Sequence, residues 1–208
     1  MPKIKKKILR VLFVLVLILA CWTVWGFFTL PVQRAPRDFS TRTSQYDFGQ
    51  VLVVYYSLTG NTGEVAERIR DMTDGSLFEI ETQKPYPSGP ALYTIARAEL
   101  KHGNFPELKE TVDDFSSYDV IFVGAPVWWY SVATPMLSFL SKADFKGKTV
   151  VPFATDGGNY GDFFVDFARE ARNAKILEGI SITGVSKTDT SILDEKISTW
   201  LEKLKSEL

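Results

Sequence analysis

Apolar residues from position 47 onward alternate between two patterns. Five short runs are rich in branched and aromatic side chains, which is typical of strands buried in a parallel sheet. These expected strands are Val51–Tyr56, Leu77–Thr82, Val120–Ala125, Thr149–Thr155 and Ile176–Ile182. Pro152 lies inside the fourth run, where it would remove one hydrogen-bond donor from the sheet.

The segments between these runs repeat apolar residues every three or four positions, which predicts helices with one buried face. The last of them carries Leu193, Ile197, Trp200 and Leu204. Asp162 is expected to cap the start of the preceding helix, the one that carries Phe164 and Phe167. Strands that alternate with helices predict an α/β fold with a doubly wound, five-stranded parallel sheet. The other marker residues are Val65, Ile69 and Met72, then Leu92, Ala96 and Leu100, then Pro135–Ala143, and then Phe164, Phe167, Ala168 and Ala171.

The N-terminal region follows a different pattern. Val11–Leu30 is a run of twenty residues without a charge. This length suffices for a helix that crosses a bilayer core of about 30 Å. We therefore predict a basic N-terminus at 1–10, one transmembrane anchor at 11–30, a linker at 31–46 and a folded domain at 47–208. Five basic residues precede the run and three follow it before residue 46, so the domain is expected outside the cytoplasmic membrane.

Other interpretations of this segment stay open. The number of basic residues differs only slightly between the two sides of the run, so a cytoplasmic domain is the alternative topology. A cleaved signal peptide would have a shorter apolar core and a cleavage site of small residues, which this run lacks. Ile18–Cys21 resembles a bacterial lipoprotein box, so lipidation at Cys21 is the second alternative to an uncleaved anchor.

Charge and composition narrow the classes of function. Eight of the 24 basic residues but one of the 25 acidic residues lie in 1–45, so residues 46–208 carry a net charge of −8. An acidic domain is a poor candidate for nucleic-acid binding. With Cys21 as its one cysteine and His102 as its one histidine, the chain offers no internal disulfide and no cysteine-rich or histidine-based metal site.

The loop after the first expected strand carries the first candidate chemistry. It is composed of small polar residues around one glycine, without lysine or arginine, which excludes the lysine-dependent loop of nucleotide triphosphatases. The free backbone N–H groups at a helix start bind anions, and hydroxyls add donors. A phosphate monoester is therefore favoured over an ordinary N-cap, which is the alternative. The candidate residues are Ser57, Leu58, Thr59, Gly60, Asn61 and Thr62.

This stretch resembles the FMN-phosphate signature of the flavodoxin family. Its matching positions are Tyr55, Ser57, Gly60, Thr62, Ala66 and Ile69. The resemblance implies the strand order 2-1-3-4-5, FMN as the cofactor, and a site beyond the carboxyl ends of strands 1, 3 and 4.

Two further loops are expected at the same end of the sheet. The loop after the third strand contains adjacent aromatic residues, which suit stacking on a flavin ring. We expect one of its two tryptophans on the ring and the other partly in the core. Val127 and Trp128 disfavour a positive φ, and Tyr130 stands where related loops commonly have a glycine. The loop after the fourth strand has paired glycines whose backbone N–H groups suit the flavin's polar edge. The candidates are Pro126, Val127, Trp128, Trp129 and Tyr130, and then Thr155, Asp156, Gly157, Gly158 and Tyr160.

Three functions compete on this basis. The first is a membrane-anchored, FMN-binding electron-transfer protein that acts with a redox partner protein or quinone of unknown identity. The second is an FMN-dependent NAD(P)H:quinone-type reductase. The third is a module that has the flavodoxin fold but no bound flavin, because a fold by itself does not establish a function.

Overall fold

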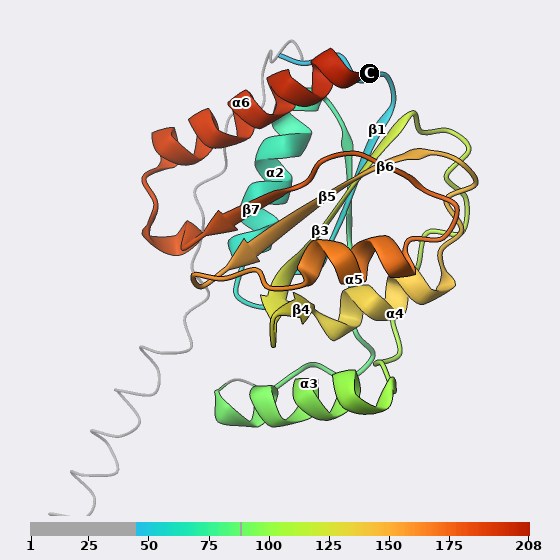
Figure 1. The fold of residues 1–208 in the computed structure, drawn as a ribbon, viewed down its shortest axis with the longest axis vertical. Coiled ribbons are helices and arrows are strands. Elements are labelled where there is room, and N and C mark those ends of the chain that lie inside the picture. Colours follow the sequence, from blue (N-terminus) through green and yellow to red (C-terminus); the bar gives the residue numbers. More distant parts are fainter. Residues whose placement is uncertain (1–44, 88) are drawn as a thin grey trace, which may run out of the picture. The chain divides into compact units, whose positions relative to one another are not determined.

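A parallel sheet organises the part of the chain that the computed structural model describes, residues 45–87 and 89–208. Its strands run in the order β2-β1-β3-β5-β6 (Figure 1). The strand β7 also pairs with β5, on the same side as β6 but farther along β5. Counting β6 and β7 as one fifth strand, this is the predicted order. The strands are β1 (Val51–Tyr55), β2 (Ser76–Glu79), β3 (Val120–Trp128), β5 (Thr149–Asp156), β6 (Lys175–Ile176) and β7 (Ile180–Thr183).

The prediction of one continuous fifth strand was wrong, and Pro152 supplies the reason. Leu177 N donates to Val150 O at 3.0 Å, so residue 150 faces β6. Residues two apart face the same neighbour, and Pro152 therefore turns a nitrogen without hydrogen toward the same edge. The chain interrupts pairing there, and Gly179 lies against the carbonyl oxygen of Pro152.

Two smaller sequence predictions also need correction. The second strand ends at Glu79, three residues earlier than expected, and Thr82 instead forms an isolated antiparallel bridge with Leu108. Asp162 occupies the N-cap position of its helix, but its side chain makes no capping hydrogen bond.

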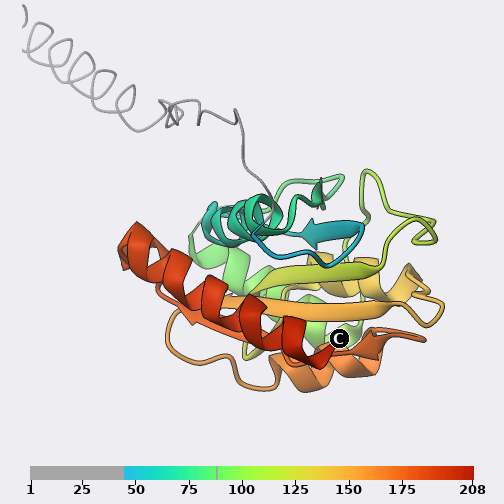
Figure 2. The same ribbon diagram turned by 90° about the horizontal axis from the view of Figure 1, so that it is seen from above.

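Helices cover both faces of the sheet (Figure 2). On one face, the buried Arg68 of α2 pairs with Asp194 of α6 at 2.7 Å and with Glu64 at 3.1 Å. The other face carries α4 and α5, and α3 lies beyond α4. The helices are α2 (Asn61–Thr73), α3 (Pro90–His102), α4 (Thr134–Lys142), α5 (Phe163–Glu170) and α6 (Thr190–Glu207), with a short 3₁₀ helix η1 (Val185–Lys187) before α6.

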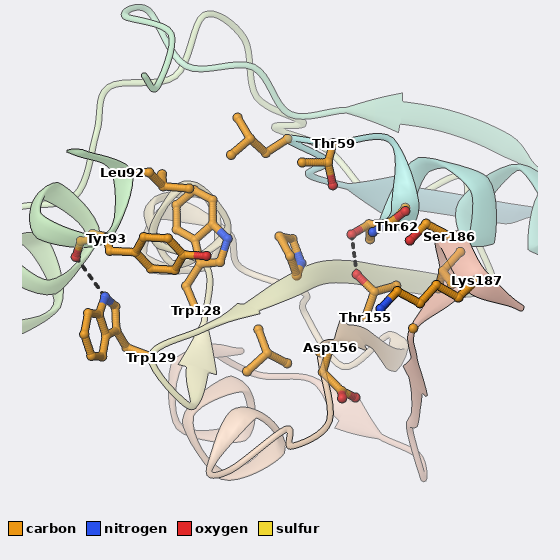
Figure 3. A pocket seen from close by; sticks show the side chains of 18 residues that line it. Thr59, Thr62, Leu92, Tyr93, Trp128, Trp129, Thr155, Asp156, Ser186 and Lys187 are labelled. Atoms are coloured by element: carbon orange, nitrogen blue, oxygen red, sulfur yellow. Dashed lines mark hydrogen bonds between the residues drawn. The ribbon is translucent and has the colours of Figure 1, made fainter. Parts of the chain in front are cut away.

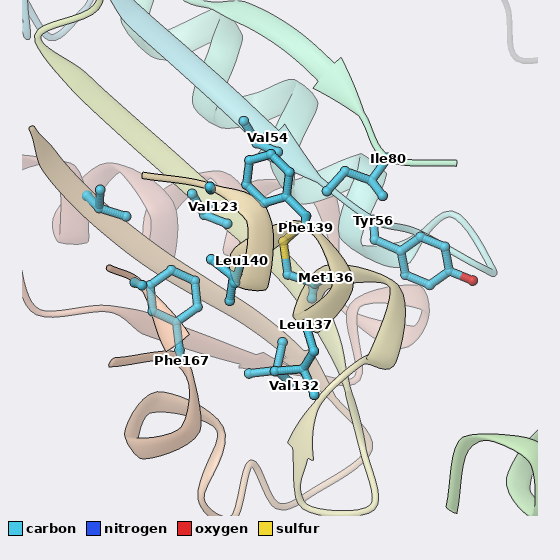
Figure 4. Packing of buried hydrophobic residues seen from close by; sticks show 14 of the residues in the cluster. Val54, Tyr56, Ile80, Val123, Val132, Met136, Leu137, Phe139, Leu140 and Phe167 are labelled. Carbon is cyan, nitrogen blue, oxygen red and sulfur yellow. The ribbon is translucent and has the colours of Figure 1, made fainter. Parts of the chain in front are cut away.

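The sheet separates two apolar clusters, because alternate residues of each buried strand point to opposite faces. Val54 and Val123 pack with Phe139 of α4 on one face (Figure 4). Phe122 and Phe153 pack under α2 and α6 on the other face. Rigid layers on both sides fix the loops at the carboxyl ends of the strands.

The predicted anchor at 11–30 lies outside the described residues, as do the basic N-terminus at 1–10 and the linker up to residue 44. None of the helices within 45–87 and 89–208 combines the length and apolar composition that a membrane crossing needs. The backbone of Tyr46 already bonds to Met72 O at 3.0 Å, and its hydroxyl lies 2.7 Å from Ser198 Oγ.

Candidate functional site

A pocket of about 370 Å³ lies at the carboxyl ends of β1, β3 and β5 (Figure 3). Its volume falls in the range of small-molecule sites. It has a polar end that includes Thr59, Thr62 and Thr155, and an aromatic end that includes Trp128 and Trp129. The three loops predicted from the sequence therefore meet around one cavity.

The loop at the polar end leaves its donors free. Gly60 precedes α2 with a φ of 88°, and no side chain caps the helix. This observation disfavours the alternative in which the hydroxyls serve as an N-cap. Ser57 Oγ is buried without any hydrogen-bond partner among residues 45–87 and 89–208. A methyl group added to Gly63, in the first turn of α2, would lie 3.7 Å from that oxygen. Since buried hydroxyls normally have partners, the loop is incomplete without a ligand.

A hydrogen bond couples the two loops at this end. Thr62 Oγ1 and Thr155 Oγ1 lie 2.8 Å apart, and both residues are buried. When Thr155 donates to Thr62, the hydroxyl hydrogen of Thr62 is free for a ligand. The end of β5 thus sets the rotamer of a residue in the first turn of α2.

Trp128 lies partly in the core, as expected for one of the two tryptophans, while stacking of the other on a flavin ring stays a prediction. Trp128 packs edge-on against Tyr56 and Tyr86, with ring centroids 5.6 and 5.1 Å apart. Trp129 is 42% exposed. Its indole N–H donates to Tyr93 O at 2.9 Å, and Arg97 lies 5.0 Å from its ring centroid. Both tryptophans line the pocket.

A tight turn after Trp128 explains why Trp128 packs inward while Trp129 is partly exposed. Trp128 pairs with Ser131, the first residue of β4 (Ser131–Val132), so a two-residue turn joins β3 to β4. Trp129 and Tyr130 have φ values of 51° and 63°, as in a type I′ turn. Val127 and Trp128 avoid positive φ, as predicted, but the two residues after them adopt it despite lacking the freedom of glycine.

Asp156 lines the pocket, but its carboxylate is already engaged. It accepts hydrogen bonds from Gly158 N at 2.6 Å, Ser181 Oγ at 2.5 Å and Thr183 Oγ1 at 2.9 Å. These bonds fasten the loop after β5 to β7. The carboxylate therefore holds the loop in place, and Gly157 beside it lines the pocket.

Some candidate residues lie away from the pocket surface. Tyr130 is 60% exposed, and Tyr160 is 49% exposed and packs against Phe164. Ser57 and Gly60 belong to the loop before α2 but are not among the residues that line the cavity. The candidates that line the cavity are Leu58, Thr59, Asn61, Thr62, Pro126, Val127, Trp128, Trp129, Thr155, Asp156 and Gly157, and those that do not are Ser57, Gly60, Tyr130, Gly158 and Tyr160.

Sequence reasoning missed two other walls. One is α3, which contributes Leu92, Tyr93 and Ala96. The sequence carries no local sign that α3 lines the pocket, because Leu92 and Ala96 belong to an ordinary helical pattern of apolar residues. The other is the segment Gly184–Lys187 after β7. The rule that places ligands at the carboxyl ends of strands could have found this segment, had it been applied to the fifth strand.

A polar network ties α3 to the rest of the domain. Glu99 accepts hydrogen bonds from Tyr86 Oη and Thr134 Oγ1, each at 2.6 Å. Burial and the bond to Glu99 raise the pKa of Tyr86, so its phenol stays protonated and donates. Since Ala96 is the one buried residue among those of α3, this network is a principal support for that wall.

Comparisons with known proteins agree with the geometry. A family model described as flavodoxin matches residues 50–204. A candidate flavoprotein from Bacteroides eggerthii has a TM-score of 0.59 and 29% identity, covering 74% of this chain and 96% of the other. A flavoprotein from Lactobacillus acidophilus, solved in complex with FMN, has a TM-score of 0.60 and 24% identity, with coverages of 73% and 97%.

One curated relative also matches. It is named NAD(P)H dehydrogenase (quinone), from Cupriavidus metallidurans, and is 29% identical over 96 residues. The match covers 45% of this chain and 46% of the relative, so the chain spans about half the length of the curated relative it matches.

Proposed function

The chain belongs to the flavodoxin family and takes that family's cofactor, FMN, and on this premise we propose that it is an electron-transfer flavoprotein. The observation that carries the proposal is the pocket with one polar and one aromatic end. In flavodoxins the cofactor lies at the switch point beyond β1 and β3, which is where this pocket lies.

The residues present fit the two ends of FMN. The buried Ser57 hydroxyl, which lacks a partner in the described part of the chain, and the uncapped first turn of α2 supply donors for the phosphate. Trp128 and Trp129 supply flat apolar walls for the ring. The backbone at Gly157 lies near enough to line the remaining side.

Bound FMN supplies the redox chemistry. The protein's own residues bind and orient it. Thr59 and Thr62 would hold the phosphate end, Trp128 is fixed by its packing against Tyr56 and Tyr86, and Asp156 fastens the loop after β5. No acid or base in the pocket is needed for electron transfer.

The central test compares two flavins. Purified residues 46–208 are expected to bind FMN with yellow absorbance and quenched flavin fluorescence. Riboflavin, which lacks the phosphate, is expected to bind at least about 1,000-fold more weakly, because it forgoes several hydrogen bonds to a charged group that contribute about 1.5–3 kcal/mol each. Equal affinities for the two flavins would refute the phosphate site, and a colourless domain that FMN does not stain would leave only the third hypothesis, a fold without flavin.

The reductase remains the second candidate, and the curated relative named NAD(P)H dehydrogenase (quinone) favours it. The exposed Trp129 at the pocket rim leaves one side of the site accessible from solvent. Steady oxidation of NADH or NADPH by the FMN-loaded domain, with a quinone as acceptor, would support the reductase over the carrier.

We further propose that Val11–Leu30 anchors the domain in the cell membrane, with the domain on the outer side. This proposal is based on the length of the uncharged run and the excess of basic residues before it. A protease added to intact spheroplasts is expected to degrade the domain. Survival of the domain until the spheroplasts are lysed would reverse the topology, and labelling by radioactive palmitate at Cys21 would favour the lipoprotein.

A further inference from the structure

We propose that Lys187 pairs its ammonium group with the FMN phosphate, and that this cation, which lies 125 residues beyond the phosphate loop, strengthens the preference for phosphorylated flavin. This inference rests on the proposed function. The loop Ser57–Thr62 itself contains no basic residue. The sequence of the loop therefore predicts a phosphate held by neutral donors. The fold brings one positively charged side chain, Lys187, to the same end of the pocket.

Chain topology places Lys187 at the polar end of the pocket. It closes η1, which follows β7, and β7 pairs with the end of β5 at Thr155 and Asp156. Gly184 N donates to Asp156 O at 2.9 Å, and Val185 is buried in the cluster under α2 and α6. Figure 3 shows the Lys187 side chain extending from η1 toward the pocket, on the side of Thr155 and Thr62.

The charges around the pocket leave the ammonium group available. Among the described residues that line the cavity, Lys187 alone is basic and Asp156 alone is acidic. The carboxylate of Asp156 already accepts three hydrogen bonds. Within 45–87 and 89–208, Lys187 makes no ion pair, whereas Arg68, Lys109 and Lys203 each do. As the one basic side chain among the described residues that line the pocket, Lys187 gives the pocket a local attraction for an anion.

The partner is the phosphate because of the pocket's asymmetry. Thr59 and Thr62 share the polar end with Lys187, while Trp128 and Trp129 form the opposite end. A dianionic phosphate at the N-terminus of α2 gains from a nearby ammonium group as well as from the helix dipole. The uncharged isoalloxazine ring at the aromatic end gains little from such a charge.

The test measures FMN and riboflavin affinities of the full-length protein and its variants by fluorescence quenching. Lys187→Ala is expected to weaken FMN binding about fivefold and to leave riboflavin binding unchanged, since an exposed ion pair contributes up to about 1 kcal/mol. Lys187→Arg should keep the FMN affinity, and Lys187→Glu should weaken it further. Lys196→Ala, which removes an exposed lysine of α6 outside the pocket, is the matched control and should change neither affinity.

Salt supplies an independent readout. Raising salt from about 0.01 M to about 1 M shortens the Debye length from about 30 Å to about 3 Å. The FMN affinity of the wild type should fall over this range more steeply than that of Lys187→Ala. Equal losses of FMN and riboflavin affinity in Lys187→Ala, or unchanged FMN affinity, would overturn the role of Lys187 while leaving the flavin site intact. Failure of the wild type to bind either flavin would instead overturn the proposed function.

Discussion

Replacing Thr59 and Thr62 together with alanine is expected to weaken FMN binding by about 3–6 kcal/mol, because each hydrogen bond to a charged group contributes about 1.5–3 kcal/mol. Both residues line the polar end of the pocket. Thr62 is additionally held by Thr155, so its hydroxyl is oriented before the ligand arrives. FMN titrations monitored by flavin fluorescence measure the loss.

The matched control keeps the hydroxyl groups. Thr59→Ser with Thr62→Ser retains both donors and should bind FMN within about tenfold of the wild type, with the lost methyl groups as the cause of the difference. The alanine pair should affect riboflavin far less than FMN. If the alanine pair bound FMN as tightly as the wild type, the phosphate would have to lie elsewhere.

Gly124→Ala is expected to lower the free energy of unfolding by about 3 kcal/mol, at the upper end of the cost of overpacking a core. Gly124 is paired with Phe153 in the adjacent strand, and an added methyl group would overlap the Phe153 ring. That ring is fully buried, so it cannot move out into solvent. Urea denaturation, followed by circular dichroism, measures the change.

Two variants show whether the overlap is the cause. Adding Phe153→Leu to Gly124→Ala should recover part of the lost stability, giving a strongly non-additive double-mutant cycle. Gly157→Ala replaces a glycine with open space around it and should change stability by less than about 1 kcal/mol. Additive losses in the cycle would show that the methyl group and the ring do not compete for the same volume.

The sequence predicted the sheet because its signals are local and strong. Runs such as Val120–Ala125 have few alternatives to a buried strand. The family resemblance then supplied the strand order, which the structure confirms. The sequence shows that Pro152 removes a hydrogen-bond donor from its own strand. In the structure, the strand that is interrupted is the neighbouring one, which is divided into β6 and β7. The position of that break depends on pairing between residues 27 positions apart, which periodicity does not encode.

The site was predictable to the extent that it is built from loops at strand ends. Thr62 and Trp128 carry the residue types that a flavin needs, and both line the pocket. Tyr93 and Lys187 were missed because they arrive from elements that approach only in three dimensions. The turn at Trp129 and Tyr130 shows the opposite problem, since side chains that disfavour positive φ adopt it where the hairpin requires it.

The interruption opposite Pro152 is also expected to limit self-association through the edge of the sheet. A long unpaired edge strand offers backbone donors and acceptors to a second chain and is a common start for aggregation. Here one edge of the sheet is β2, with four residues, and the other is divided into β6, with two, and β7, with four. Neither edge presents an uninterrupted template. The proline that breaks the regularity of the sheet thus keeps one of its two edges discontinuous.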